Sequence, residues 1–333
     1  MRTVPLIILC AVLAAAVQLD ASGTHLVPVL LGMALVQGVV LVVAAVELSN
    51  GKWLEPVRRP LLAFAPLLFL FPFLVRLAPY PWLGHETRWL RPDFFLARNV
   101  AALLVLAAVG VSYARRSLAA RPSARKWAVA YILAFALVQT MVAGDWMMSL
   151  DYPWVSTMFP ALYMVECFYA GLVLLGVICF LRERRAAGGL GTTVYDGASL
   201  SFGFALFWGG LTFAQYLTIW YGNLPEEVRY FTLRFGLAAG VPLFTASIGL
   251  LFVVPFGILL VHRARKSPAM YFLLGVVVLL GLLVSRLFQV LPHLRIDPGF
   301  LAVELVAMLG IVALTVRRGL ETPASSAAPA NGP

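Results

Sequence analysis

Long apolar runs separated by short polar connections dominate the pattern of this 333-residue chain. Most runs approach the length of about 20 residues that a bilayer-spanning helix needs, and none alternates with the period of two typical of a membrane β-strand. The pattern therefore predicts an all-α fold, a polytopic membrane helical bundle of about ten transmembrane helices. The predicted spans cover residues 4–17, 25–46, 60–77, 94–113, 127–150, 156–181, 198–221, 237–261, 269–288 and 299–316.

Composition narrows the class of protein. Hydrophobic residues make up 62% of the chain and charged residues 12%, with a mean hydropathy of +0.91, whereas a soluble domain is about half apolar and about a quarter charged. This excludes a soluble globular enzyme. We expect residues 1–318 to form one integral membrane domain in the lipid bilayer, and residues 319–333, rich in Pro, Ala and Ser, to form a disordered cytoplasmic tail.

The distribution of Lys and Arg predicts the orientation of the spans. Of the 25 positive residues, 17 fall on one set of alternating connections and 8 on the other, and the richer side is normally cytoplasmic. Both termini are therefore expected in the cytoplasm. Residues 1–23 also fit a secretory signal, with one Arg and a short apolar core, but a retained first helix is favoured.

Residues that hold metals or prosthetic groups are scarce. Cys10, Cys167 and Cys179 each stand alone in an apolar run, so the sequence contains no iron–sulfur ligand set. The four histidines fall at span ends or in loops, where they cannot face each other as haem ligands inside a bundle. No phosphate-binding loop and no basic domain occur. We expect this chain to bind no metal, no redox centre and no nucleic acid.

Ionisable side chains at bilayer depth are the first candidates for function, because each costs about 2.5–3.5 kcal/mol to insert. Glu166 is the clearest, near the middle of the sixth span, where desolvation favours the protonated form. Asp145 lies at the outer end of the fifth span among Trp146 and two methionines, a poor place for a solvated charge. A proton-relay role and a structural hydrogen bond to a neighbouring helix are both open for these two carboxyls.

The outer hairpins carry further charges. Asp151, before a proline turn, is interpreted as a residue that caps or solvates the turn. The next hairpin carries Glu226, Glu227, Arg229 and Arg234. Either a salt-bridged loop or contact with a basic partner surface accounts for this second group, and Asp151 is a further candidate for a structural ion pair or a partner contact.

Other polar positions are harder to interpret. On the seventh span Trp208, Thr212 and Gln215 recur at i, i+4 and i+7, with Tyr216 adjacent. Such a stripe either lines a polar cavity or forms hydrogen bonds that hold neighbouring helices together. Near outer span ends, where snorkelling or mutual pairing is the usual explanation, lie Arg98, Arg286 and Glu304.

Two hairpin motifs resemble a known family. DWMMSLDYPWVSTMF, at residues 145–159, is similar to the form DW.MSL.P.W.ST.F, and FWGGLTFAQYLTIWYGNLPEEVRYFTLR, at residues 207–234, to FW....FSQY..IWY.N.PEE followed by Arg. Over about residues 50–265 the chain resembles the second NrfD-like integral membrane subunit of alternative complex III, in the polysulfide-reductase membrane-subunit superfamily.

The resemblance implies two four-helix bundles with flanking helices, in the inner membrane of a bacterium. It implies partners: a paralogous NrfD-like membrane subunit, an iron–sulfur subunit, haem c subunits and, in some assemblies, a terminal oxidase. The iron–sulfur clusters and haem c would belong to those partners, while contact with quinol or quinone is open for this chain. The family's polar positions fall on Asp145, Asp196, Gln215, Tyr216, Glu226, Glu227 and Arg234.

Two departures from the family pattern stand out: Glu166 has no counterpart in it, and the segment after Asp196 lacks the family's Lys. The favoured interpretation is a subunit of a quinol-oxidising respiratory complex, without a redox centre of its own. It would contribute to assembly, quinone interaction or proton translocation, with Asp145, Glu166 and Asp196 as stations of a proton path. The alternatives are a purely structural scaffold subunit and a secondary transporter, which the lack of an internal repeat disfavours.

Overall fold

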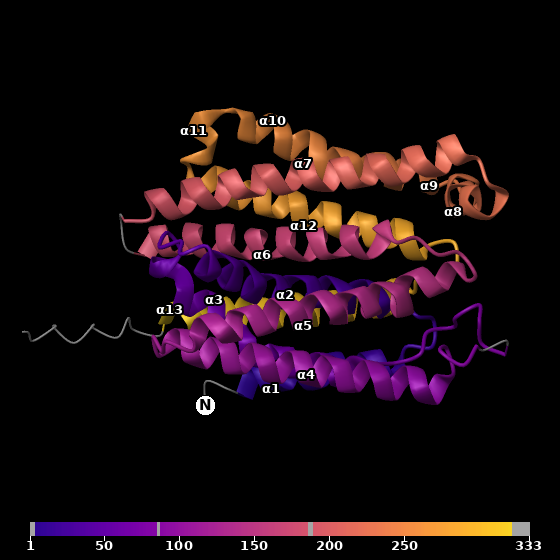
Figure 1. Cartoon of the computed structure of the whole chain (residues 1–333), viewed down its shortest axis with the longest axis horizontal. Helices are drawn as coiled ribbons and strands as arrows, with labels where there is room; N and C mark the ends of the chain where they lie inside the picture. The colour runs from indigo at the N-terminus through magenta and orange to yellow at the C-terminus, as the bar shows by residue number, and fades with distance from the viewer. Residues whose placement is uncertain (1–3, 85–86, 186–188, 322–333) are drawn as a thin grey trace, which may run out of the picture.

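The chain is helical along its described length. The computed structural model describes residues 4–84, 87–185 and 189–321, and no strand occurs among them. The helices run side by side in an elongated bundle (Figure 1). The α-helices are α1 (Val4–Leu19), α2 (Leu26–Leu48), α3 (Arg58–Leu62), α4 (Pro92–Leu118), α5 (Ala124–Val142), α6 (Met158–Arg185), α7 (Gly191–Gly222), α8 (Pro225–Phe235), α9 (Gly240–Ile248), α10 (Val254–Leu260), α11 (His262–Arg265), α12 (Pro268–Val290) and α13 (Pro298–Glu321).

Five short segments of tighter or wider helix complete the list. Three are 3₁₀-helices and two are π-helices, and they continue or join the α-helices where the backbone ladder changes register. They are η1 (Glu55–Val57), η2 (Ala65–Leu74), η3 (Ala143–Met147), η4 (Met148–Asp151) and η5 (Gly249–Val253).

The predicted multi-pass membrane architecture is confirmed. Among the described residues, nine helical elements are long and apolar enough to cross a bilayer. Each overlaps one of the predicted spans from the second to the tenth. The remaining predicted span is α1, whose 16 residues extend only about 24 Å, less than the hydrocarbon thickness of about 30 Å.

The two ends of the bundle differ in charge. One end, which we call the basic end, carries most of the Lys and Arg residues, including those of α11 (Figure 1). The opposite end, called here the hairpin end, holds the turn between η4 and α6 and the short helix α8. The basic end is the one that the charge count predicts to face the cytoplasm.

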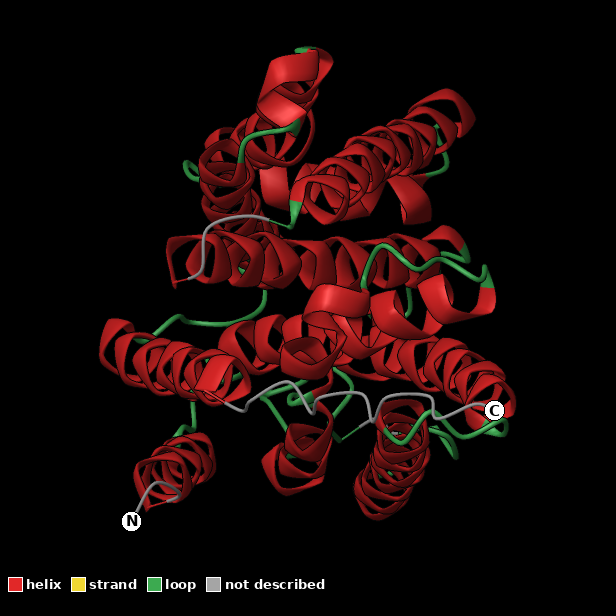
Figure 2. Cartoon of the chain, turned by 90° about the vertical axis from the view of Figure 1, so that its left-hand side faces the viewer, coloured by secondary structure: helices red, strands yellow, loops and turns green. Residues whose placement is uncertain are grey.

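The spans pack as two four-helix bundles with two flanking helices, as expected. The first bundle contains α2, α3 with η2, α4 and α5; the second contains α6, α7, α9 with α10, and α12. Helices α1 and α13 pack against each other, and α13 also packs against α2 (Figure 2). The large contact between α2 and α6 joins the two bundles.

Close approach of backbones explains this junction. A Cβ atom on Gly38 of α2 would collide with the backbone carbonyl of Cys167 on α6, and one on Gly171 would collide with the carbonyl of Gly38. Only glycine permits such an approach. Nearly every residue of α2 is buried, because helices surround it on all sides.

Some boundaries differ from the prediction. The third span is not one α-helix: α3 ends at Leu62 and η2 follows, because Pro66 and Pro72 lack the N–H groups that a continuous α-helix needs. At the other end of the chain α13 continues to Glu321, past the expected domain boundary at residue 318. The rest of the predicted tail, residues 322–333, lies outside the described residues.

Candidate functional site

A buried carboxylate lies inside the second bundle. Glu166 of α6 has no exposed surface, and each of its oxygens has a partner. Oε1 accepts hydrogen bonds from Trp208 Nε1 on α7 at 3.0 Å and from Ser285 Oγ on α12 at 3.2 Å. Oε2 forms an ion pair with the guanidinium of Arg286 on α12. The glutamate thereby ties three helices of the bundle together.

Arg286 differs from its sequence interpretation. Its side chain is 1% exposed and turns into the bundle, instead of snorkelling to the membrane surface. Nη1 donates to Gln289 Oε1 at 2.7 Å, and the guanidinium carbon lies 4.6 Å from the ring centre of Tyr163. The sequence interpretation of Glu166 considered desolvation alone and omitted Arg286 as its partner.

A second ion pair lies at the hairpin end of the same bundle. Arg234 of α8 contacts Asp151 of η4 with both Nη atoms, at 3.0 and 2.8 Å. Both side chains are buried, and His293 Nε2 lies 2.8 Å from Asp151 Oδ1. Of the roles considered for Asp151, the structure shows the structural ion pair and not a solvated cap of the turn, because both of its oxygens bind the guanidinium.

Aromatic and backbone groups complete the second pair. The guanidinium of Arg234 lies 3.8 Å from the ring centre of Tyr230, a cation–π geometry. Its nitrogens also donate to the backbone carbonyls of Tyr230, Phe288 and Gln289. Burial raises the pKa of Tyr230 to about 12, so its phenol stays neutral at physiological pH.

Gln289 connects the two ion pairs. Its backbone carbonyl accepts from Arg234 Nη2 at 2.7 Å, while its side-chain carbonyl accepts from Arg286 Nη1 at 2.7 Å. Its amide nitrogen lies 3.4 Å from Ser285 Oγ, which itself donates to Glu166. Two sets of hydrogen bonds, one around Glu166 inside the bundle and one around Asp151 and the partly exposed His293 at the hairpin end, therefore meet at Gln289, where its covalent frame joins them.

Asp145 belongs to the first bundle. It lies in the π-helix η3, and its Oδ2 accepts from Arg98 Nη2 at 2.6 Å and from Asn99 Nδ2 at 2.9 Å, both on α4. Trp89 Nε1 donates to Oδ1 at 3.0 Å, and its ring lies 3.9 Å from the guanidinium carbon of Arg98. Asp145 is thus a buried, paired carboxylate, in a different bundle from Glu166.

The outer hairpin charges are arranged differently from the expected salt-bridged loop. Arg234 pairs with Asp151 and not with the glutamates of its own hairpin. Glu227 accepts a hydrogen bond from Trp154 Nε1 at 2.9 Å, while Glu226 and Arg229 are exposed. With Asp151, these three residues line a shallow pocket of about 210 Å³ at the hairpin end.

Three other predicted residues lie apart from Glu166. Asp196 is half-buried near the start of α7, about 18 Å along the helix from Trp208 at 1.5 Å per residue. Gln215 is buried on the same helix, and Tyr216 is half-buried. The structure brings Glu166 and Trp208 together, but it does not bring Asp145, Glu166 and Asp196 into one cluster.

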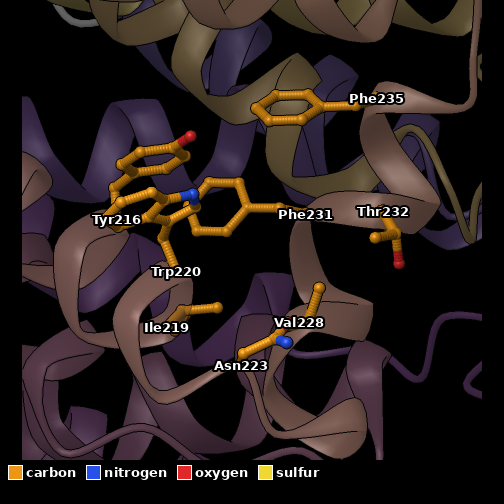
Figure 3. Close-up of a pocket in the computed structure, with 8 residues that line it drawn as sticks. All are labelled: Tyr216, Ile219, Trp220, Asn223, Val228, Phe231, Thr232 and Phe235. Carbon is orange, nitrogen blue, oxygen red and sulfur yellow. The ribbon is translucent and has the colours of Figure 1, made fainter.

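An aromatic cleft of about 340 Å³ opens between α7 and α8. Tyr216 and Phe231 lie at its centre with their rings edge to face at a centroid distance of 5.2 Å, and Trp220 stands beside them (Figure 3). Asn223 and Thr232 add polar groups to the wall. The cleft suits a flat or elongated apolar molecule better than a charged one.

Sequence reasoning found Glu166 but missed its partners. The available signal was the set Ser285, Arg286 and Gln289 on an otherwise apolar helix, whose i and i+4 members share one face. Chemically, the site holds a buried ion pair linked to a partly exposed histidine, an arrangement able to bind and release a proton. No protein-family profile matches this chain, and no curated protein is detectably similar to it.

Proposed function

We propose that this chain is a membrane subunit of a bacterial respiratory complex that oxidises quinol, of the alternative complex III type, and that its second bundle carries protons. The observation behind this proposal is the two sets of hydrogen bonds, one around Glu166 and one around Asp151 and His293, that meet at Gln289. A charge buried in a bilayer is costly and usually serves an ion or proton path. The motifs at residues 145–159 and 207–234 support the type of complex.

The proposed path runs between Glu166 and the hairpin end. A proton that reaches Glu166 would neutralise it and release Arg286, which already donates to Gln289. The backbone carbonyl of Gln289 also accepts a hydrogen bond from Arg234. The displaced charge would therefore change the electrostatic potential at Asp151 and His293. His293 would respond by releasing a proton of its own to water, so one proton is bound at Glu166 and a different one leaves at the hairpin end.

The test is the Glu166→Gln variant in the native complex. Glutamine keeps a carbonyl oxygen for Arg286 but cannot bind and release a proton. We expect electron transfer to persist and the number of protons moved per electron to fall. Glu183→Gln, at the basic end of the same helix, is the matched control and should move protons as the wild type does. Unchanged proton transport in Glu166→Gln would leave the scaffold alternative.

Membership of the complex has its own test. When this chain is tagged and purified from native membranes in mild detergent, we expect iron–sulfur and haem c subunits and a paralogous membrane subunit to copurify. The optical spectrum of the c-type haems and mass spectrometry of the subunits are the readouts. A chain that purifies alone, or with partners that carry no redox centre, would contradict the assignment and favour the transporter alternative.

The aromatic cleft supports contact with quinone. Its volume of about 340 Å³ and its aromatic walls fit a planar ring, and the side-chain amide of Asn223 offers a hydrogen bond to a quinone carbonyl. Thr232→Trp should fill the cleft and lower the amount of quinone extracted per purified complex. Thr245→Trp, at an exposed position on α9 that does not line the cleft, is the control. Equal quinone content in both variants would place the quinone elsewhere.

A further inference from the structure

Glu304 is a buried carboxyl without a partner. It lies on α13, outside both four-helix bundles, and has no exposed surface. Neither of its oxygens makes a hydrogen bond. The other buried carboxylates of the described chain, at Asp20, Asp145, Asp151 and Glu166, all have hydrogen-bond donors. Glu304 therefore needs a separate explanation.

Two charged groups at the hairpin end act on Glu304: Asp20, which follows α1, and Arg76, which follows η2. His25, which precedes α2, joins this group through its contact with Asp20. Asp20 and Arg76 lie close enough to act electrostatically on Glu304, with opposite effects. Arg76 is held by the carbonyl of Val17, to which its Nη1 donates at 2.7 Å. The charges of α3, Arg58 and Arg59, are at the basic end of the bundle, and Glu166 of α6 is paired with Arg286.

His25 also has a buried ring nitrogen that makes no hydrogen bond. Its Nδ1 lies 3.0 Å from Asp20 Oδ2, and its Nε2 is buried without a hydrogen-bond partner. Burial opposes ionisation of Asp20, but hydrogen bonds from His25 and Ser22 outweigh it and hold the pKa of Asp20 below its ordinary value. In the neutral tautomer that donates from Nδ1 to Asp20, the buried Nε2 carries a lone pair that can accept a proton.

Energetics decide the state of Glu304. A carboxylate buried without a donor is far less stable than the neutral acid, which the protein reaches by binding one proton. Asp20 nearby makes a second negative charge still less favourable. The Thr24 hydroxyl accepts from the backbone N–H of Asp297 at 2.9 Å and holds the loop of His25 beside the start of α13.

We propose that Glu304 and His25 form a proton-binding site between α1, α2 and α13, separate from the Glu166 network. Glu304 holds the proton in the resting state. In exchange, the O–H bond of Glu304 breaks and an N–H bond forms at His25 Nε2, through an intervening water molecule because the two groups are not in hydrogen-bond contact. The imidazolium is then stabilised by Asp20 and the carboxylate by Arg76. The loop of residues 20–25 opens to the hairpin end at Ala21 and Ser22.

Infrared difference spectroscopy of the purified full chain in lipid nanodiscs tests the site directly. We expect a carbonyl-stretch band of a protonated carboxylic acid at neutral pH, shifted in D₂O and lost in Glu304→Gln. Glu321→Gln, at a solvent-accessible position of the same helix, and Glu166→Gln should both keep the band. A wild-type spectrum without this band, or a band that survives in Glu304→Gln, would overturn the proposal.

The role of His25 has a kinetic test. After a rapid rise in pH, loss of the Glu304 band should be several-fold slower in His25→Gln than in the wild type. His293→Gln, which removes the histidine of the other network, should leave the rate unchanged. An unchanged rate in His25→Gln would remove the histidine from the site. Glu304→Gln should keep the wild-type thermal stability, since it replaces a neutral acid by a neutral amide. A lower melting temperature would indicate an ionised, structural Glu304 and contradict the proposal.

Discussion

The two four-helix bundles join their helices in the interior through different kinds of polar contact. In the first bundle, the polar contact near the centre of α2 is neutral: the side-chain amides of Gln37 and Gln139 bond to each other, and Tyr131 donates to the backbone carbonyl of Gln37 at 3.0 Å. In the second bundle the corresponding interior contact is a charged pair, Glu166 with Arg286. Neutral amides suffice to hold membrane helices together. The charges of the second bundle therefore call for a reason beyond packing.

At the hairpin end the bundles are alike. Each has an aspartate paired with an arginine whose guanidinium lies against an aromatic ring: Asp145, Arg98 and Trp89 in the first bundle, and Asp151, Arg234 and Tyr230 in the second. Between the interior and the hairpin end, the interior contact is thus the one that distinguishes the two bundles. This locates the candidate proton path in the second bundle and leaves the first as its structural counterpart.

The largest effect is expected from Arg286→Leu. It leaves Glu166 buried without its counter-charge, and breaking a buried pair in this way costs about 3–5 kcal/mol. We expect a strong fall in the melting temperature of the purified chain, measured by circular dichroism in detergent. The double variant Glu166→Gln with Arg286→Leu should recover part of the loss. Equal stability of Arg286→Leu and the wild type would show that the pair contributes nothing to the fold.

The fold was predictable because its signal is local. Apolar runs identify the spans, and charges mark their ends, so the helical membrane class and nine of the ten predicted spans follow from the chain alone. The grouping into two four-helix bundles was implied by the family resemblance. The broken third span was missed although Pro66 and Pro72 are visible in the sequence. Proline occurs in unbroken membrane helices too, so its presence alone does not reveal a 3₁₀ segment.

The candidate site was predictable only in part. Glu166 stands out because it is an acid in the middle of an apolar run. Its partner is 120 residues away, near the end of another run, where an arginine usually reaches the membrane surface. From the sequence, Glu304 was expected, like Arg286, to reach the membrane surface or to pair near it. It is also buried. Which end-of-span charges turn inward depends on helix rotation, and a single sequence contains no measure of that angle.

The hairpin-end pairs should give intermediate effects. Arg234→Met removes a guanidinium that is 1% exposed and bonds to three backbone carbonyls, so we expect a loss of about 2–4 kcal/mol. Arg98→Met removes one that is 10% exposed, and water can partly replace it, so the loss should be about 1–2 kcal/mol. Denaturant titration of both variants in the same detergent compares them. A larger loss of unfolding free energy in Arg98→Met than in Arg234→Met would contradict the expectation that the more buried arginine contributes more to stability.

The junction of the bundles offers a smaller perturbation. Gly38→Ala adds one methyl group where α2 touches the backbone of α6, and the helices must move apart to admit it. Overpacking of this kind costs about 1–3 kcal/mol. Gly203→Ala, at a position on α7 with open space around it, is the control and should be neutral or slightly stabilising because alanine favours helix. Thermal unfolding distinguishes the two, and a neutral Gly38→Ala would contradict the close approach of α2 and α6.

The smallest effect is expected from a double change at the neutral centre of the first bundle. Gln37→Leu alone leaves the Gln139 amide buried without a partner and should cost about 1–3 kcal/mol, whereas the double change Gln37→Leu with Gln139→Leu removes both polar groups and should be nearly neutral. Proton transport by the complex should be unaffected by the double change if the first bundle is only structural. Thermal unfolding and the proton-to-electron ratio are measured on the same preparations. A normal melting temperature combined with lost proton transport would place a path in the first bundle and remove the functional distinction between the two.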